Sequence, residues 1–149
     1  MELKHIAIEE RAALLPSLLD VWESSVRATH DFLREGDVDF LRPYVEQGLR
    51  EIPVLFCVLE AGLPLAFLGM ADDRIEMLFV HADSCHGGIG SALMREALAR
   101  GACHVDVNEQ NPQALGFYQR FGFEVVSRDA VDSLSLPYPI LHCSLPERD

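Results

Sequence analysis

Residues 80–93 read VHADSCHGGIGSAL, and this stretch decides the fold. Gly87, Gly88 and Gly90 stand where an apolar segment typical of a strand gives way to one typical of a helix. Glycine costs conformational entropy, so three of them in four positions indicate a tight turn or a ligand that comes close to the backbone. The first N–H groups of a helix lack intrahelical partners and carry the positive end of its dipole. The stretch therefore predicts an anion site, suited to a diphosphate, at the start of a helix.

Two common nucleotide-binding loops do not match these residues. A Walker loop ends in Gly-Lys-Ser/Thr, whereas Gly90 is followed by Ser91 and Ala92. A Rossmann fingerprint has Gly or Ala three positions after Gly90, where this chain has Leu93. Taken alone, the glycines are equally compatible with a tight strand-to-helix turn that binds nothing.

The apolar patterns around the loop predict an α/β (α+β) chain with a mixed central sheet, because hairpins alternate with crossover helices. Helical periodicity is expected at residues 10–26, 37–50, 91–100 and 112–121, the last with Asn111 as its N-cap. Strand patterns are expected at residues 3–8, 54–60, 65–70, 75–80, 103–107, 123–126 and 140–145.

Length and charge limit the possible partners. The chain has 149 residues, so we expect a single domain over residues 1–149. Its net charge of −12 argues against nucleic acid, which needs clustered Lys and Arg. That charge suits a cationic amine substrate, although acidity that serves only solubility is the more common explanation.

Targeting signals and cysteine spacing give two further expectations. No apolar run is long enough to cross a bilayer, and the N-terminus lacks the apolar core of a signal peptide, so we expect a cytoplasmic protein that does not bind membranes. Cys57, Cys85, Cys103 and Cys143 form no CxxC pair. This spacing favours free thiols over disulfides and predicts no metal site.

A second motif settles which diphosphate is expected. Residues 111–123 read NPQALGFYQRFGF and match the pattern Asn-x-x-Ala-x-x-Phe-Tyr-x-x-x-Gly-Phe, while CHGGIG at 85–90 matches Arg/Gln-x-x-Gly-x-Gly/Ala at its two glycines. With a strand between them, these motifs resemble the GNAT superfamily of N-acetyltransferases, and the segments 22–33, 107–118 and 136–142 resemble its YjaB-like branch. The resemblance implies a GNAT-like fold in which two parallel strands of the sheet splay apart between flanking helices.

The resemblance also implies that acetyl-CoA is the cosubstrate. Cys85 stands where the family has Arg or Gln, which weakens one expected diphosphate contact, and His86 is the nearest replacement. The cofactor-binding residues implied are Leu78, Phe79, Val80, Cys85, His86, Gly87, Gly88, Ile89, Gly90, Ser91, Asn111, Ala114, Phe117 and Tyr118.

Direct acetyl transfer to an amine, with no acyl-enzyme, is the reaction that the family implies. Tyr118 matches the family's general acid, since a phenol stays protonated at neutral pH. Glu76 shares the side-chain parity of Leu78 on the expected cleft strand and is the first candidate base, and His30 is the second. Trp22, His30, Asp31, Asn108 and Tyr138 are expected around the acceptor.

The sequence leaves the acceptor and the class of function open. The acceptor is an amine of a small molecule or of a protein. A non-catalytic acyl-CoA-binding module is the alternative that Cys85 favours and Tyr118 opposes, and a nucleotide-binding protein is a third. Family members often pair, which makes a homodimer one candidate assembly, and the sequence leaves the oligomeric state open.

Overall fold

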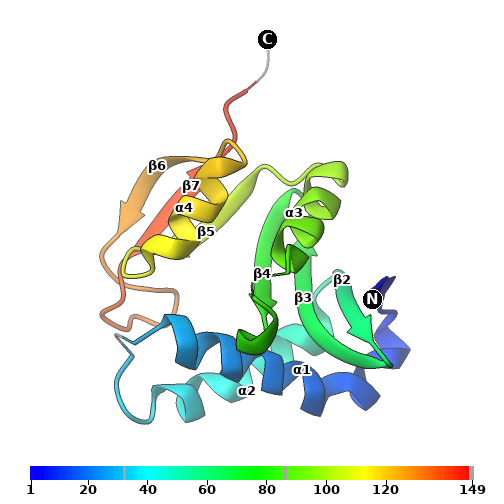
Figure 1. The fold of residues 1–149 in the computed structure, drawn as a ribbon. Coiled ribbons are helices and arrows are strands. Elements are labelled where there is room, and N and C mark those ends of the chain that lie inside the picture. Colours follow the sequence, from blue (N-terminus) through cyan, green and yellow to red (C-terminus); the bar gives the residue numbers. More distant parts are fainter. Residues whose placement is uncertain (32, 86, 148–149) are drawn as a thin grey trace.

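The structure, a computed structural model, describes residues 1–31, 33–85 and 87–147. It contains a mixed sheet of seven strands in the order β1-β2-β3-β4-β5-β7-β6 (Figure 1). The strands are β1 (Glu2–His5), β2 (Val54–Glu60), β3 (Leu63–Ala71), β4 (Arg74–Val80), β5 (His104–Asn108), β6 (Glu124–Asp129) and β7 (Ile140–Ser144). The helices are α1 (Ile8–Thr29), α2 (Asp37–Glu51), the short 3₁₀ helix η1 (Ala82–Ser84), α3 (Ile89–Ala99) and α4 (Pro112–Arg120). The predicted mixed α/β sheet is confirmed.

Several predicted boundaries are wrong by two or three residues, among them the end of β1 and the start of α3. β1 ends at His5 rather than at residue 8, because exposed Ile8 already begins α1. The helix expected from Ser91 begins at Ile89, since Gly88 takes the left-handed conformation at φ +76° and caps it. The anion-binding N–H groups therefore start two residues earlier along the chain than the pattern predicted.

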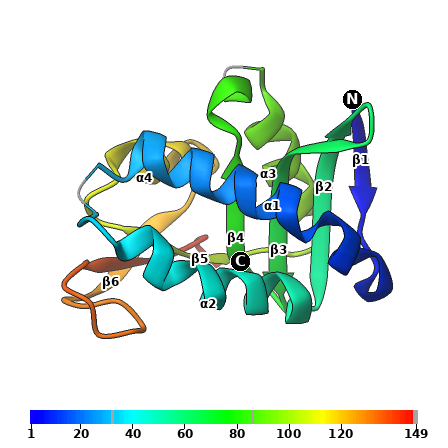
Figure 2. The ribbon, with the colours of Figure 1, turned by 90° about the horizontal axis from the view of Figure 1, so that it is seen from below.

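The helices cover both faces of the sheet. Helices α1 and α2 lie together across one face of β1–β4, and α3 and α4 lie on the opposite face (Figures 1 and 2). Each face has its own apolar core: α1 and α2 bury side chains such as Leu18 and Leu49, and α3 buries Leu93 and Met94. The half of the sheet formed by β1–β4 is therefore covered by helices on both faces. No helix of the described residues combines the length and apolar character needed to cross a bilayer.

The parallel pair β4–β5 opens into a V. These strands pair only at Arg74↔His104 and Ile75↔Val105, after which β4 continues on the β3 side and β5 pairs with β7. A β-bulge in β4 adds to the divergence: Ile75 faces Met70, Met77 faces Gly69, and Glu76 is the extra residue between them. A bulge bends its strand and increases the local twist. The predicted splayed parallel strands are thus confirmed.

One buried cation ties α1 to the end of α2. Arg11 is 1% exposed, and its guanidinium donates to the backbone oxygens of Ile6, Leu49, Arg50 and Ile52. The last carbonyls of a helix have no intrahelical donor and carry the negative end of its dipole. Arg11 therefore satisfies the C-terminus of α2 from inside the core.

We predict that Arg11→Leu lowers the free energy of unfolding by about 3 kcal/mol, because it leaves several buried carbonyls without a donor. Arg27→Leu on the same helix is the matched control. The Arg27 side chain is 61% exposed and, within the described part of the chain, pairs only with Glu23, so its loss should cost less than about 0.5 kcal/mol. Urea denaturation measures both variants. Equal costs for the two would show that the buried guanidinium adds no more to stability than an exposed one.

Candidate active site

A cleft of about 560 Å³ occupies the V between β4 and β5. One wall is β4 from Ile75 to Val80, and the other is formed by β5 and the start of α4. The last turn of α1 and its C-cap also line the cleft, through Ser25, Ala28, Thr29 and His30. A cleft that runs between two strands exposes unpaired backbone groups of both, so it can hold an extended polar ligand.

The glycine loop and α3 stand at one end of this cleft. Gly90 lines the cleft, and a Cβ built on it would meet Val80 at 3.6 Å and Phe117 at 3.7 Å. The first intrahelical bond runs from Ala92 N–H to the Gly88 oxygen, so the N–H groups before Ala92 lack helical acceptors. No side chain of the described residues caps them. The start of α3 is therefore a site for an anion that enters from the cleft.

Tyr118 points its hydroxyl into the cleft. The residue is 7% exposed, and its ring packs edge-on against Phe117 and Phe123. Among the residues that the structure describes, this hydroxyl makes no hydrogen bond, and no side-chain polar atom is buried without a partner. Its oxygen must therefore reach the cleft. Burial, with a smaller effect from Cys143, raises the pKa of Tyr118 well above its usual value, so the phenol stays protonated at neutral pH.

His30 faces the cleft as a neutral ring. Its Nδ1 lies 2.7 Å from the Thr29 hydroxyl, and that hydroxyl donates its own proton to the backbone carbonyl oxygen of Ser25 at 2.8 Å. The Thr29 oxygen must then accept from Nδ1–H, which makes Nε2 the nitrogen with the lone pair. Burial lowers the pKa of His30, and the opposing charge of Asp31 is the smaller influence. His30 is therefore a proton acceptor at neutral pH.

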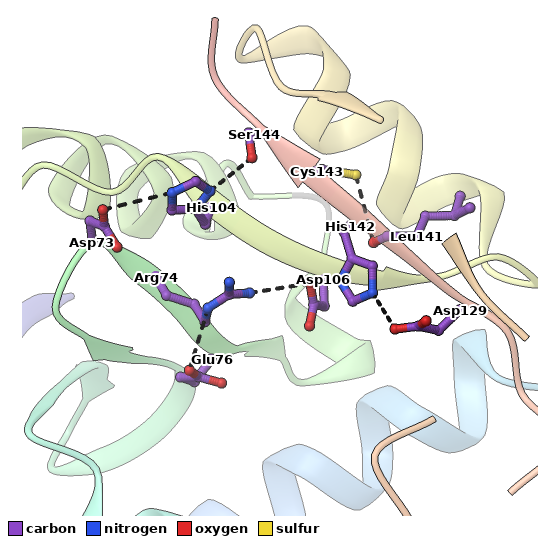
Figure 3. A network of polar contacts seen from close by, with 10 residues as sticks. All are labelled: Asp73, Arg74, Glu76, His104, Asp106, Asp129, Leu141, His142, Cys143 and Ser144. Carbon is purple, nitrogen blue, oxygen red and sulfur yellow. Dashed lines mark hydrogen bonds and ion pairs between the residues drawn. The ribbon is translucent and has the colours of Figure 1, made fainter. Parts of the chain in front are cut away.

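Acidic side chains gather where the cleft meets the open face of β5 and β7. Arg74 joins two of them, with Nε 3.9 Å from Glu76 and Nη1 3.2 Å from Asp106 (Figure 3). His142 continues the chain: its Nδ1 lies 2.7 Å from Asp106 and its Nε2 2.6 Å from Asp129. Because carboxylates only accept, both ring nitrogens must donate, and hydrogen bonds to Asp129 and then to Asp106 raise the pKa of His142.

The comparisons with known proteins agree with this geometry. Residues 53–125 match the family model of an acetyltransferase (GNAT) domain. A curated relative, the peptidyl-lysine N-acetyltransferase YjaB of Salmonella typhimurium, is 38% identical over 130 residues, which are 87% of this chain and 90% of the relative. The chain belongs to the GNAT family of acetyltransferases. The expected acetyl-CoA-dependent N-acetyltransferase is thereby confirmed as an enzyme of a family whose cosubstrate is acetyl-CoA.

Solved GNAT structures have the same fold. The solution structure of apo-form YjaB from Escherichia coli matches with a TM-score of 0.80 and 35% identity, covering 97% of each chain. The PaiA N-acetyltransferase of Thermoplasma acidophilum, in complex with coenzyme A, matches with a TM-score of 0.63 at 17% identity, covering 95% of this chain and 98% of that one. The likeness to PaiA is one of fold alone.

The residues predicted to hold acetyl-CoA fall into two groups. Four of them do not line the cleft: Gly87, Gly88, Ile89 and Ser91. Ile89 is also buried in the core, so these residues can contact the cosubstrate only through their backbone groups. His86 lies outside the described residues. Those that do line the GNAT cleft are Leu78, Phe79, Val80, Cys85, Gly90, Asn111, Ala114, Phe117 and Tyr118. A glycine-lined helix start beside a long cleft fits a ligand that carries a diphosphate at one end.

The residues predicted around the acceptor are more scattered. His30 and Asn108 line the GNAT cleft, whereas Asp31 lines a separate hollow between α1 and α2. Trp22 is 3% exposed within the core under α1 and lines neither. The Tyr138 hydroxyl donates to Asp37 and accepts from Arg34 N–H at 3.2 Å, so it fastens the loop before β7 to the start of α2.

Glu76 lines the cleft and is the extra residue of the bulge in β4, and its role as the base stays a prediction. Ile75 and Leu78 pack in the same core although they are three residues apart, because the bulge breaks the alternation at Glu76. Sequence reasoning missed Asp106 and His142. The sequence contained one signal for Asp106: it stands between the apolar Val105 and Val107 in a strand, so its side chain lies on the face of β5 opposite to theirs.

His142 gives the stability of the enzyme a pH dependence. Its pKa is raised in the folded state, so its stabilising effect is complete below the unfolded value of about 6.5 and is lost as the pH rises through the folded pKa. We predict that His142→Gln is most destabilising at pH 5.5 to 6.5 and much less so at pH 9, as measured by urea denaturation. A constant difference across that range would mean that the ring is not held charged.

Proposed function

We propose that this enzyme acetylates the ε-amino groups of lysine residues exposed on proteins. Support comes from the 38% identical relative, whose name gives peptidyl-lysine as its acceptor. The acidic side chains Glu76 and Asp106 line the cleft, and they favour a cationic group such as a lysine ammonium over a neutral or anionic one.

Tyr118 is the proposed proton donor, and its hydroxyl carries the assignment. A buried ring whose unpartnered hydroxyl opens into the cleft is placed to protonate a departing thiolate. The raised pKa keeps that proton available at neutral pH.

The opposite wall is proposed to receive the amine. Glu76, which already pairs with Arg74 at 3.9 Å, attracts the ammonium. His30 takes its proton, because the lone pair on Nε2 belongs to a ring held neutral by burial. The neutral amine then attacks the thioester carbonyl, and the carbon–sulfur bond breaks. The departing thiolate takes the Tyr118 proton, and the nitrogen of the new amide releases its extra proton to the solvent, from which Tyr118 is reprotonated.

A set of blocked peptides tests the acceptor. One peptide has an acetylated N-terminus and a single lysine, the second has arginine in its place, and the third has a free N-terminus but no lysine. We expect acetyl-CoA-dependent acetylation of the first peptide alone, read by mass spectrometry. Acetylation of the third peptide, or only of small amines such as polyamines, would overturn the lysine assignment while leaving the enzyme an N-acetyltransferase.

The two acceptor-side residues should give different kinetic defects. His30→Gln should lower kcat by about 10²-fold and remove the acidic limb of the pH–rate profile, which lies below pH 6.5 because the pKa of His30 is lowered. Glu76→Gln should instead raise KM for the lysine peptide and keep that limb. If Glu76→Gln loses the limb and His30→Gln keeps it, the two roles must be exchanged.

A further inference from the structure

A cluster of metal-binding side chains lies outside the active site. Asp73 in the turn after β3, Cys103 just before β5, and His104 at its first position each offer one ligand atom. These three atoms all lie within 4.8 Å of one another. The Cys103 sulfur is 3.3 Å and His104 Nε2 is 3.8 Å from Asp73 Oδ2.

The spacing and chemistry fit a tetrahedral zinc site. Zinc binds sulfur at about 2.3 Å and nitrogen or oxygen at about 2.0–2.2 Å, so neighbouring ligands of a tetrahedron are roughly 3.3–3.8 Å apart. A thiolate and a carboxylate balance the charge of the ion, and a neutral imidazole completes a mixed donor set that zinc favours. Binding would release the thiol proton of Cys103, which now hydrogen-bonds to Asp73, to the solvent.

The backbone and a neighbouring strand hold these ligands in place. The backbone N–H groups of Cys103 and His104 both donate to the backbone carbonyl oxygen of Asp73, at 2.8 and 3.2 Å. His104 Nδ1 lies 2.8 Å from the Ser144 hydroxyl, and this contact turns Nε2 toward Asp73 (Figure 3). A second hydrogen bond that orients a histidine in this way is typical of metal-ligating histidines.

We propose that Asp73, Cys103 and His104 bind one zinc ion, with water as the fourth ligand. The site lies next to the two register pairs, Arg74↔His104 and Ile75↔Val105, that join β4 to β5. An ion there ties the β3–β4 turn to the start of β5, at the end of the V where the strands have not yet separated. It therefore stabilises the junction between the two halves of the sheet without entering the cleft.

Metal titration tests this site independently of acetyl transfer. After treatment with EDTA and desalting, the full chain should bind one Zn²⁺, measured against a chromophoric chelator. Co²⁺ should give the intense d–d bands of a tetrahedral ion and a thiolate charge-transfer band. Ser144→Ala should weaken Zn²⁺ binding by about 10- to 100-fold, and Cys103→Ser should weaken it further. The control Cys85→Ser, which removes the other exposed or half-exposed thiol, should bind like the wild type.

A second measurement needs no variant. In the wild-type chain, Zn²⁺ should slow the alkylation of Cys103 but not that of Cys85, as followed by peptide mass spectrometry. Equal alkylation rates with and without Zn²⁺, a cobalt spectrum without a thiolate band, or unchanged binding in Cys103→Ser would each overturn the proposal.

Discussion

Tyr118→Phe should lower kcat by about 10²- to 10⁴-fold while leaving the affinity for acetyl-CoA within about twofold of the wild type. The reason is that the change removes only the hydroxyl. The ring, which packs against Phe117 and Phe123 and is 7% exposed, keeps its place in the core. General acid catalysis contributes a factor of this size. Single-turnover kinetics with a lysine peptide separates the chemical step from binding.

A neighbouring aromatic residue supplies the control for Tyr118. Phe117→Leu also alters the aromatic cluster beside the cleft, but it removes no proton donor. We expect it to weaken cosubstrate binding more than it lowers kcat. If Tyr118→Phe kept near-normal turnover, Tyr118 would be a packing residue and the thiolate would have to take its proton from another group or from water.

Gly88→Val should weaken coenzyme A binding by about 10- to 100-fold, which is the loss expected when one charge-assisted hydrogen bond of ~1.5–3 kcal/mol is removed. At φ +76°, Gly88 has a conformation that a β-branched residue adopts only with strain. A valine there shifts the cap of α3 and with it the N–H groups that point toward the cleft. Isothermal titration calorimetry measures the effect.

Gly101→Val separates strain from ligand binding. Gly101 follows the other end of α3 at φ +88°, and, as at Gly88, a Cβ built on it meets no atom within 4 Å. Both variants should therefore lose similar stability in thermal unfolding. Only Gly88→Val should lose affinity for coenzyme A. Equal affinities in the two variants would remove the start of α3 from the diphosphate site.

The sequence predicted the parts of this fold that depend on local patterns. Strand and helix periodicities are properties of short segments, and the glycine loop and the segment 111–123 each lie within one turn and one helix. The family resemblance then supplied the splayed strands. Tyr118 was found because its motif fixes it on the face of α4 that meets the cleft.

Features that depend on tertiary packing could not be predicted in this way. Periodicity assumes that side chains alternate along β4, and one extra residue at the bulge shifts the side-chain alternation at Glu76. Trp22 was expected at the acceptor, but it lies on the apolar face of α1 and is buried in the core, as the helical periodicity of residues 10–26 already indicated. The pair of Asp106 and His142 joins residues 36 positions apart, so neither strand alone contains a signal for it.

The most direct test of the whole account is a crystal structure of the enzyme with coenzyme A. We predict that the diphosphate accepts hydrogen bonds from the N–H groups at the start of α3, and that the thiol end lies between β4 and β5 within reach of the Tyr118 hydroxyl. A structure in which coenzyme A binds elsewhere, or in which the V between these strands closes and holds no ligand, would contradict the assignment.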